Sequence, residues 1–247
     1  YLGDDLNLQS IVNAERKPLP DFAQFLSRWI DLLKRTDERS ARYLLREAVT
    51  LSGGTSAIAK LAREEGDRYP RAYVDWIKAL EKDRDFHSML QAAKEGLTNV
   101  PKDHTVRAEI AEGMVRAGEY LHDTEAQLTG WHEAFYSDPS LSYLLSLLSV
   151  AEAKDRYGEE IGAAITRIAS LVERENKRQG RSFVADDELR ESTASESLLN
   201  EAYLLAGRYD DASNLCKNKE ALGWSDGRNP KGLTIPFFWY FSTKERI

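Results

Sequence analysis

Residues 197–216, SLLNEAYLLAGRYDDASNLC, constrain the fold of this chain more than any other stretch. Leu199 and Leu205 belong to a set of apolar residues at helical spacing, and Gly207 supplies the conformational freedom with which a helix ends. Asp210 and its acidic neighbour follow at once and favour the start of a second helix through the helix dipole. The stretch is therefore predicted to form two amphipathic helices joined by a Gly-Arg-Tyr turn.

Weaker copies of this helix pair occur upstream, each with an aromatic residue at the predicted turn. Phe86 and Tyr120 lie 34 residues apart, and Tyr157 marks a third turn. Because each turn is flanked by helical periodicity, we predict an all-α fold, an α-α superhelix of antiparallel hairpins. Tyr120 and Tyr209 are predicted to be buried where the two helices of a hairpin converge.

The N-terminal part of the chain is predicted to hold a linker and three helices. Residues 1–19 show no clear period, and Pro18 and Pro20 mark their end, so we interpret them as a lead-in or linker. Apolar stripes predict helices over residues 21–35 and 37–51. The pair Gly53-Gly54 should break the second of these helices, and Thr55 should cap a third.

The domain prediction is a single α-solenoid over residues 20–247. An insertion is expected near residues 173–190, where the sequence is polar and lacks a sustained apolar stripe. Residues 217–247 contain the run Leu-Thr-Ile-Pro-Phe-Phe-Trp-Tyr-Phe, which we expect to act as an aromatic cap on the last hairpin.

Charge and composition restrict the classes of partner. The net charge is −7, and the 34 basic residues are interleaved with 41 acidic ones rather than gathered in a patch. This pattern argues against nucleic acid as a direct partner of this segment. No apolar run is long enough to cross a membrane, no signal peptide is recognisable, and the single cysteine excludes an intrachain disulfide. We expect a cytoplasmic protein and, because the sequence begins at Tyr1, a piece of a longer chain.

The residue patterns of known catalytic and metal sites are missing from this sequence. The four histidines are scattered, and none stands at a ligand spacing with another histidine or with Cys216. There is no nucleophile elbow, phosphate loop, zincin helix or dinucleotide fingerprint. We therefore expect no enzyme activity, no catalytic residue, no metal site and no cofactor.

A family resemblance follows from the hairpin pattern. The order Leu-Asn-x-Ala-Tyr-x-x-x-Gly-x-Tyr-x-x-Ala in residues 199–212 resembles the tetratricopeptide repeat, whose helix pair recurs about every 34 residues. The resemblance covers roughly residues 69–216. It implies a scaffold that presents a concave surface to protein partners.

A second resemblance concerns three stretches, RYPRAYVDWIKALEKDRDF, VRAEIAEGMVRAGEYL and WHEAFYSDPS. They resemble the helical regions that follow the zinc finger in bacterial and archaeal SWIM zinc-finger proteins. The finger needs Cys-x-Cys followed by Cys-x-His, whereas this chain has only Cys216. No metal-binding or nucleic-acid role is carried over to this segment.

These observations predict a non-catalytic interaction scaffold that binds a peptide or protein on its concave helical surface. The repeat register places five charged residues on the inward sides of their helices, a locally basic groove suited to an acidic or C-terminal peptide: Arg71, Lys78, Lys82, Glu112 and Arg116. An ordinary solvated helix face is an equally open interpretation. The alternatives are an accessory domain of a larger nucleic-acid-associated SWIM zinc-finger protein and an enzyme of unrecognised type.

Overall fold

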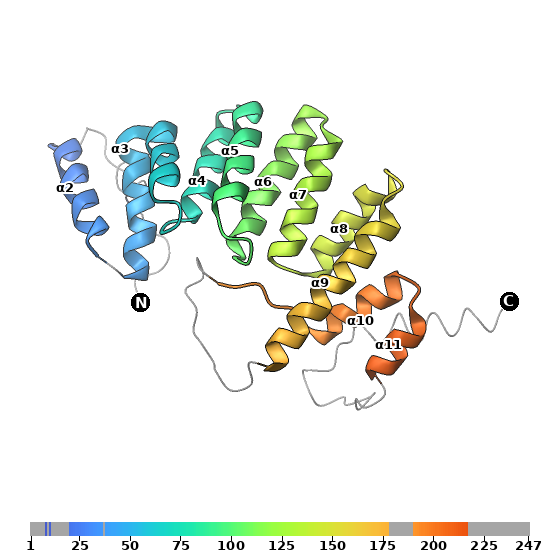
Figure 1. The fold of residues 1–247 in the computed structure, drawn as a ribbon. Coiled ribbons are helices and arrows are strands. Elements are labelled where there is room, and N and C mark those ends of the chain that lie inside the picture. The colour runs from blue at the N-terminus through green and yellow to red at the C-terminus, as the bar shows by residue number, and fades with distance from the viewer. Residues whose placement is uncertain (1–7, 9, 11–19, 37, 178–189, 217–247) are drawn as a thin grey trace. The chain divides into compact units, whose positions relative to one another are not determined.

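The computed structural model describes residues 8, 10, 20–36, 38–177 and 190–216. In this part of the chain the structure is helical and contains no strand; the nearest approach to a sheet is one isolated bridge between His104 and Glu191 (Figure 1). The prediction of an all-α protein is thereby confirmed.

Within the described residues the chain forms ten helices. They are α2 (Phe22–Lys34), α3 (Arg39–Glu65), α4 (Arg71–Lys82), α5 (Phe86–Asn99), α6 (Val106–Leu121), α7 (Thr124–Ser137), α8 (Leu141–Glu152), α9 (Tyr157–Lys177), α10 (Glu196–Leu205) and α11 (Tyr209–Cys216). They belong to two compact units, which we describe separately. Unit 1 comprises residues 1–133 and 184–191, and unit 2 comprises residues 134–183 and 192–247.

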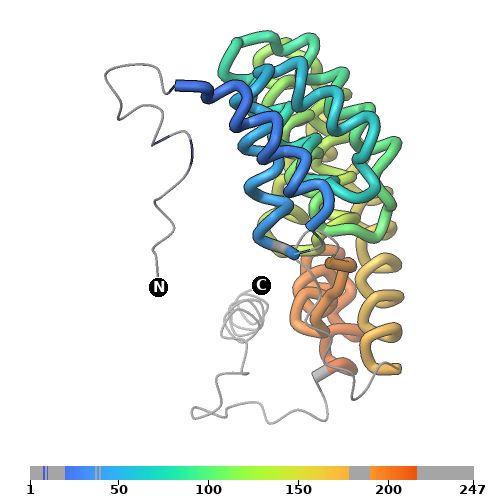
Figure 2. Tube along the Cα trace, turned by 90° about the vertical axis from the view of Figure 1, so that its left-hand side faces the viewer, coloured from blue at the N-terminus to red at the C-terminus, as the bar shows by residue number. Residues whose placement is uncertain are grey.

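In unit 1 each helix packs on the next one along the chain. Contacts join α2 to α3, α3 to α4, α4 to α5 and α5 to α6, and α4 also touches α6. Figure 2 looks along this series of helices from its N-terminal end, with the blue helices in front and the green ones behind. The apolar sides meet in a shared core whose largest fully buried residues are Leu45, Ile58, Tyr69, Tyr73, Ile77, Met89 and Ile110.

Most of the predicted turns lie where the periodicity placed them. Asp85 caps α5 by accepting a hydrogen bond from the backbone N–H of Ser88 at 3.1 Å. The turn before α9 has Asp155 at φ 57°, and the turn before α11 has Gly207 at φ 69°. Both residues lie in the left-handed region, which ends a helix and which glycine adopts without strain.

The predicted break at Gly53-Gly54 is confirmed, because α3 (Arg39–Glu65) consists of two helical halves that meet at the non-helical Gly54. Gly54 has φ 61° and ψ −149°, so the chain changes direction there while α3 continues to Glu65. The hydroxyl of Thr55, predicted to be a cap, instead donates a hydrogen bond to Asp83 at 3.1 Å. The kink is thereby tied to the turn that follows α4.

The turn predicted at Tyr120 is absent, and the predicted burial of this residue is wrong. Helix α6 runs through Gly118 and Tyr120 to Leu121 and ends at His122, whose backbone is left-handed at φ 54°. A Cβ on Gly118 would lie 3.1 Å from that of Ala126, so this glycine allows α7 to approach closely instead of forming a turn. Tyr120 is 62% exposed and is not a buried plug.

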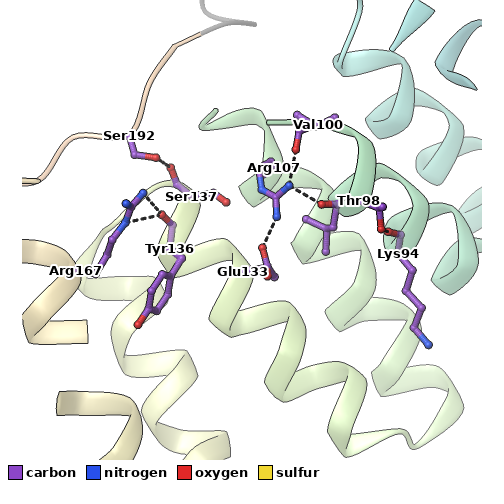
Figure 3. A network of polar contacts seen from close by, with 10 residues as sticks. Lys94, Thr98, Val100, Arg107, Glu133, Tyr136, Ser137, Arg167 and Ser192 are labelled. Carbon is purple, nitrogen blue, oxygen red and sulfur yellow. Dashed lines mark hydrogen bonds and ion pairs between the residues drawn. The ribbon is translucent and has the colours of Figure 1, made fainter. Parts of the chain in front are cut away.

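An arginine is buried inside unit 1. Arg107 on α6 is only 2% exposed, and its Nη1 donates to the carbonyl oxygens of Leu97 and Val100 at 2.6 Å each. Its Nη2 donates to the Glu133 carboxylate on α7 (Figure 3). The guanidinium therefore satisfies the last carbonyls of α5, which have no partner within their own helix.

Unit 2 contains the helices α8 to α11. Helix α8 packs on α9, α9 on α10 and α10 on α11. Tyr157, the first residue of α9, donates from its hydroxyl to the carbonyl oxygen of Leu205 at 2.9 Å. The hydroxyl of fully buried Ser192 donates to the carbonyl oxygen of Ser137 at 2.5 Å (Figure 3). Tyr209, the other predicted plug, is half-buried.

Several predicted segments lie outside the described residues. These are almost all of the lead-in at 1–19, the centre of the insertion near 173–190, and the aromatic cap at 217–247. Helix α9 extends to Lys177, so the first residues of the predicted insertion are helical. A single domain over residues 20–247 stays a prediction. Among the described helices, none combines the length and apolar character that a membrane crossing requires.

Candidate partner-binding site

A pocket of about 470 Å³ lies in unit 1 between the first half of α3 and helix α4. Residues of both helices line it, together with Gly54 and Thr55 at the kink of α3. The lining residues are Tyr43, Arg46, Glu47, Thr50, Leu51, Gly54, Thr55, Asp75, Lys78, Ala79, Lys82 and Asp83.

Two of the predicted site residues, Lys78 and Lys82, line this pocket. They are four residues apart on α4, so their side chains leave the helix on the same side. Both are exposed, and among the described residues neither ammonium group takes part in an ion pair. The α4 side therefore presents two lysine ammonium groups to the pocket, beside the carboxylates of Asp75 and Asp83.

The opposite wall is held in place by a partly buried ion pair. Arg46 on α3 is 6% exposed, and its Nε donates to the Asp75 carboxylate on α4 at 2.7 Å. The Thr50 hydroxyl in turn donates to the Arg46 carbonyl oxygen at 2.8 Å. Tyr43 stands at the rim with 55% of its surface exposed. The pocket thus combines two lysines with an aromatic rim on a fixed frame.

The other three predicted site residues do not line the pocket. Arg71 makes two hydrogen bonds to Glu109, at 2.5 and 3.2 Å. Arg116 makes two to Glu81, at 2.8 and 3.1 Å, and its Nη1 lies 3.9 Å from Glu112. Each of these bidentate pairs joins α4 to α6.

These ion pairs reduce the number of predicted cations that are available to a ligand. The guanidinium groups of Arg71 and Arg116 are matched by carboxylates of the neighbouring helix, so their charges are largely compensated within the protein. Of the four predicted cationic site residues, Lys78 and Lys82 are the two that make no ion pair among the described residues.

Sequence reasoning missed the α3 wall of the pocket. The apolar stripe predicts a helix at residues 37–51, but the repeat pattern begins at about residue 69. It therefore predicts no binding role for Tyr43, Arg46 or Glu47. The Gly53-Gly54 pair is the sequence signal for this wall, because Gly54 divides α3 into two halves, each long enough to be one helix of a hairpin.

None of the described groups with a resolved pKa shift lines the pocket, and the shifts have structural causes. The hydrogen bond to Glu95 raises the pKa of Arg63, and burial raises the pKa of the Tyr73 hydroxyl. In unit 2, burial raises the pKa of Glu201. Desolvation and pairing of this kind arise wherever ionisable groups meet a core.

No group of three or more metal-ligating side chains is present within the part of the chain that the structure describes. A scan against protein-family models, a search of curated proteins and a search of solved structures each found no match to this chain. The geometry and charge of the pocket are consequently the evidence that bears on function.

Proposed function

We propose that this chain is a non-catalytic scaffold of tetratricopeptide-like helical hairpins that binds an acidic peptide segment at the pocket between α3 and α4. The observation that carries the proposal is the pair of exposed lysines, Lys78 and Lys82, over a pocket whose other cation, Arg46, is already paired.

The packing order supports the repeat architecture within unit 1. In a stack of hairpins, the first helix of one hairpin contacts both its own partner and the first helix of the next. Helix α4 meets this expectation, because it packs on α5 and also on α6. The first half of α3, α4 and α6 then correspond to successive first helices, which line the concave surface of such a stack.

Charge and size support an acidic peptide as ligand. A carboxylate placed between the two ammonium groups would accept charge-assisted hydrogen bonds, which are roughly twice as strong as neutral ones. The pocket volume of about 470 Å³ is within the range of about 300–1,000 Å³ typical of ligand sites. The exposed Tyr43 ring and the Leu51 side chain offer apolar contact beside the charges.

Reversing both lysine charges should abolish this binding. We expect the variant Lys78→Glu/Lys82→Glu to bind a fluorescein-labelled acidic peptide at least about tenfold more weakly than the wild type, because attraction becomes repulsion at the same positions. Fluorescence anisotropy titration at low and moderate salt measures the effect. Wild-type affinity should also fall as salt rises, since exposed charges are screened.

Lys94→Glu/Lys102→Glu is the matched control, because it makes the same charge change at two exposed positions of unit 1 that do not line the pocket. This variant should retain most of the wild-type affinity. If it loses as much affinity as the double variant, the effect reflects net charge alone and the pocket is not the binding site. If the double variant binds as well as the wild type, the proposal is wrong.

A further inference from the structure

Two aromatic side chains stack on the surface of unit 1 next to the pocket. The rings of Phe86 and Tyr120 have centroids 3.9 Å apart and an interplanar angle of 9°. Phe86 is the first residue of α5 and is half-buried, whereas Tyr120 lies in the last turn of α6 and is 62% exposed. Since Phe86 covers one face of the Tyr120 ring, the opposite face meets solvent.

The chain and two polar contacts connect this stack to the pocket. The Thr55 hydroxyl at the pocket end donates to Asp83, which itself lines the pocket. Phe86 follows Asp83 by three residues, so their Cα atoms are at most about 11 Å apart. The Glu81–Arg116 ion pair ties the last turn of α4 to α6 in the same region. Lys82 and Tyr120 thus lie at the C-terminal ends of α4 and α6, two helices that pack on each other.

We propose that the exposed face of Tyr120 is a second subsite of the same peptide surface, which receives an aromatic side chain of the acidic ligand. This inference rests on the proposed function. The ligand it defines has an acidic residue for Lys78 and Lys82 and an aromatic residue about three to five positions away, a separation that an extended peptide spans at about 3.3–3.6 Å per residue.

Two physical arguments favour an aromatic side chain at this position. Offset stacking on a flat, pre-positioned ring adds to the affinity beyond the area that is buried, and tyrosine is enriched at binding hot spots. The Tyr120 ring is already oriented by Phe86, so less conformational entropy is lost when a ligand ring stacks on it. The two unpaired lysines fix the sign of the charge that accompanies the aromatic group.

Four fluorescein-labelled synthetic decapeptides test the inference. They combine an acidic or a neutral amide cluster with either tryptophan or alanine four residues away, and anisotropy gives the dissociation constant of each. With the wild type, tryptophan should improve the affinity of the acidic peptide about threefold to tenfold, in line with stacking energies. Tyr120→Ala should remove this advantage and leave the preference for the acidic over the neutral peptide intact.

Phe25→Ala is the control, because Phe25 is another exposed aromatic residue of unit 1, at 47% exposure on α2. It should change neither preference. An acidic preference without a tryptophan advantage, or a tryptophan advantage that survives Tyr120→Ala, overturns the aromatic subsite and leaves the proposed function standing. Absence of any acidic preference in the wild type would refute the proposed function itself.

Discussion

Replacing Arg107 with methionine should lower the free energy of unfolding by about 2 to 4 kcal/mol, because it removes a buried donor to two carbonyl oxygens and to a partly exposed carboxylate. Methionine keeps much of the side-chain volume but donates no hydrogen bond. The carbonyl oxygens of Leu97 and Val100 would lose their donor, and the Glu133 carboxylate would lose its countercharge. Urea denaturation followed by circular dichroism gives the free energy.

Arg63→Met is the comparison that isolates burial. Arg63 also makes two hydrogen bonds to a glutamate, Glu95, at 2.9 and 3.1 Å, and its guanidinium lies 4.5 Å from the centre of the Trp76 ring. Its side chain is 53% exposed, so water replaces much of what is lost. We expect a loss of only about 1 kcal/mol. Equal losses for the two variants would contradict the role given to burial.

Gly130→Ala should also destabilise the protein, although alanine is the better helix former. A Cβ at this position of α7 would lie 2.6 Å from Cγ2 of Val115 and 2.9 Å from the carbonyl oxygen of Ala111, both on α6. Separating the two helices costs about 1 to 3 kcal/mol, which exceeds the gain of up to about 1 kcal/mol in helix propensity. We expect a net loss of about 1 to 2 kcal/mol in urea denaturation.

The same substitution at Gly162 should have the opposite sign. Gly162 is exposed on α9, and a Cβ there would meet nothing within 4 Å. Only the propensity gain remains, so Gly162→Ala should raise the free energy of unfolding by about 0.5 to 1 kcal/mol. If both variants shift in the same direction, the close approach of α6 and α7 at Gly130 is wrong.

The helices were predictable wherever an apolar stripe was bounded by a local stop signal. The predicted helix at 21–35 is α2, and the turns at Phe86, Tyr157 and Gly207 separate the helices that periodicity predicted around them. Local sequence determines such features because capping groups and helix-ending residues act within a few positions along the chain.

The end of α6 could not be predicted in this way. Gly118 resembles a helix stop, yet its lack of a side chain serves the contact with α7, and the non-glycine residue His122 takes the left-handed conformation instead. The resulting error in register placed Phe86 and Tyr120 at equivalent positions of successive repeats. The structure instead stacks the two rings on each other. A contact between residues 34 positions apart depends on tertiary packing, which a local pattern does not report.

Only part of the candidate site could be predicted for the same reason. The helical spacing of Lys78 and Lys82 was sufficient to place both on one side of α4. The partners of Arg71 and Arg116, in contrast, are 38 and 35 residues away in the sequence. Which cations are neutralised, and therefore where the basic surface lies, becomes apparent only when neighbouring helices are packed together.

The most direct test of the central claim, that an acidic peptide occupies the pocket between α3 and α4, is a map of backbone amide chemical shifts during titration with the acidic tryptophan peptide. The shifts should concentrate in residues 43–55 and 75–86 and around Tyr120, and they should disappear in Lys78→Glu/Lys82→Glu. Saturable shifts centred on α10 and α11, or shifts that persist unchanged in the double variant, would contradict the account.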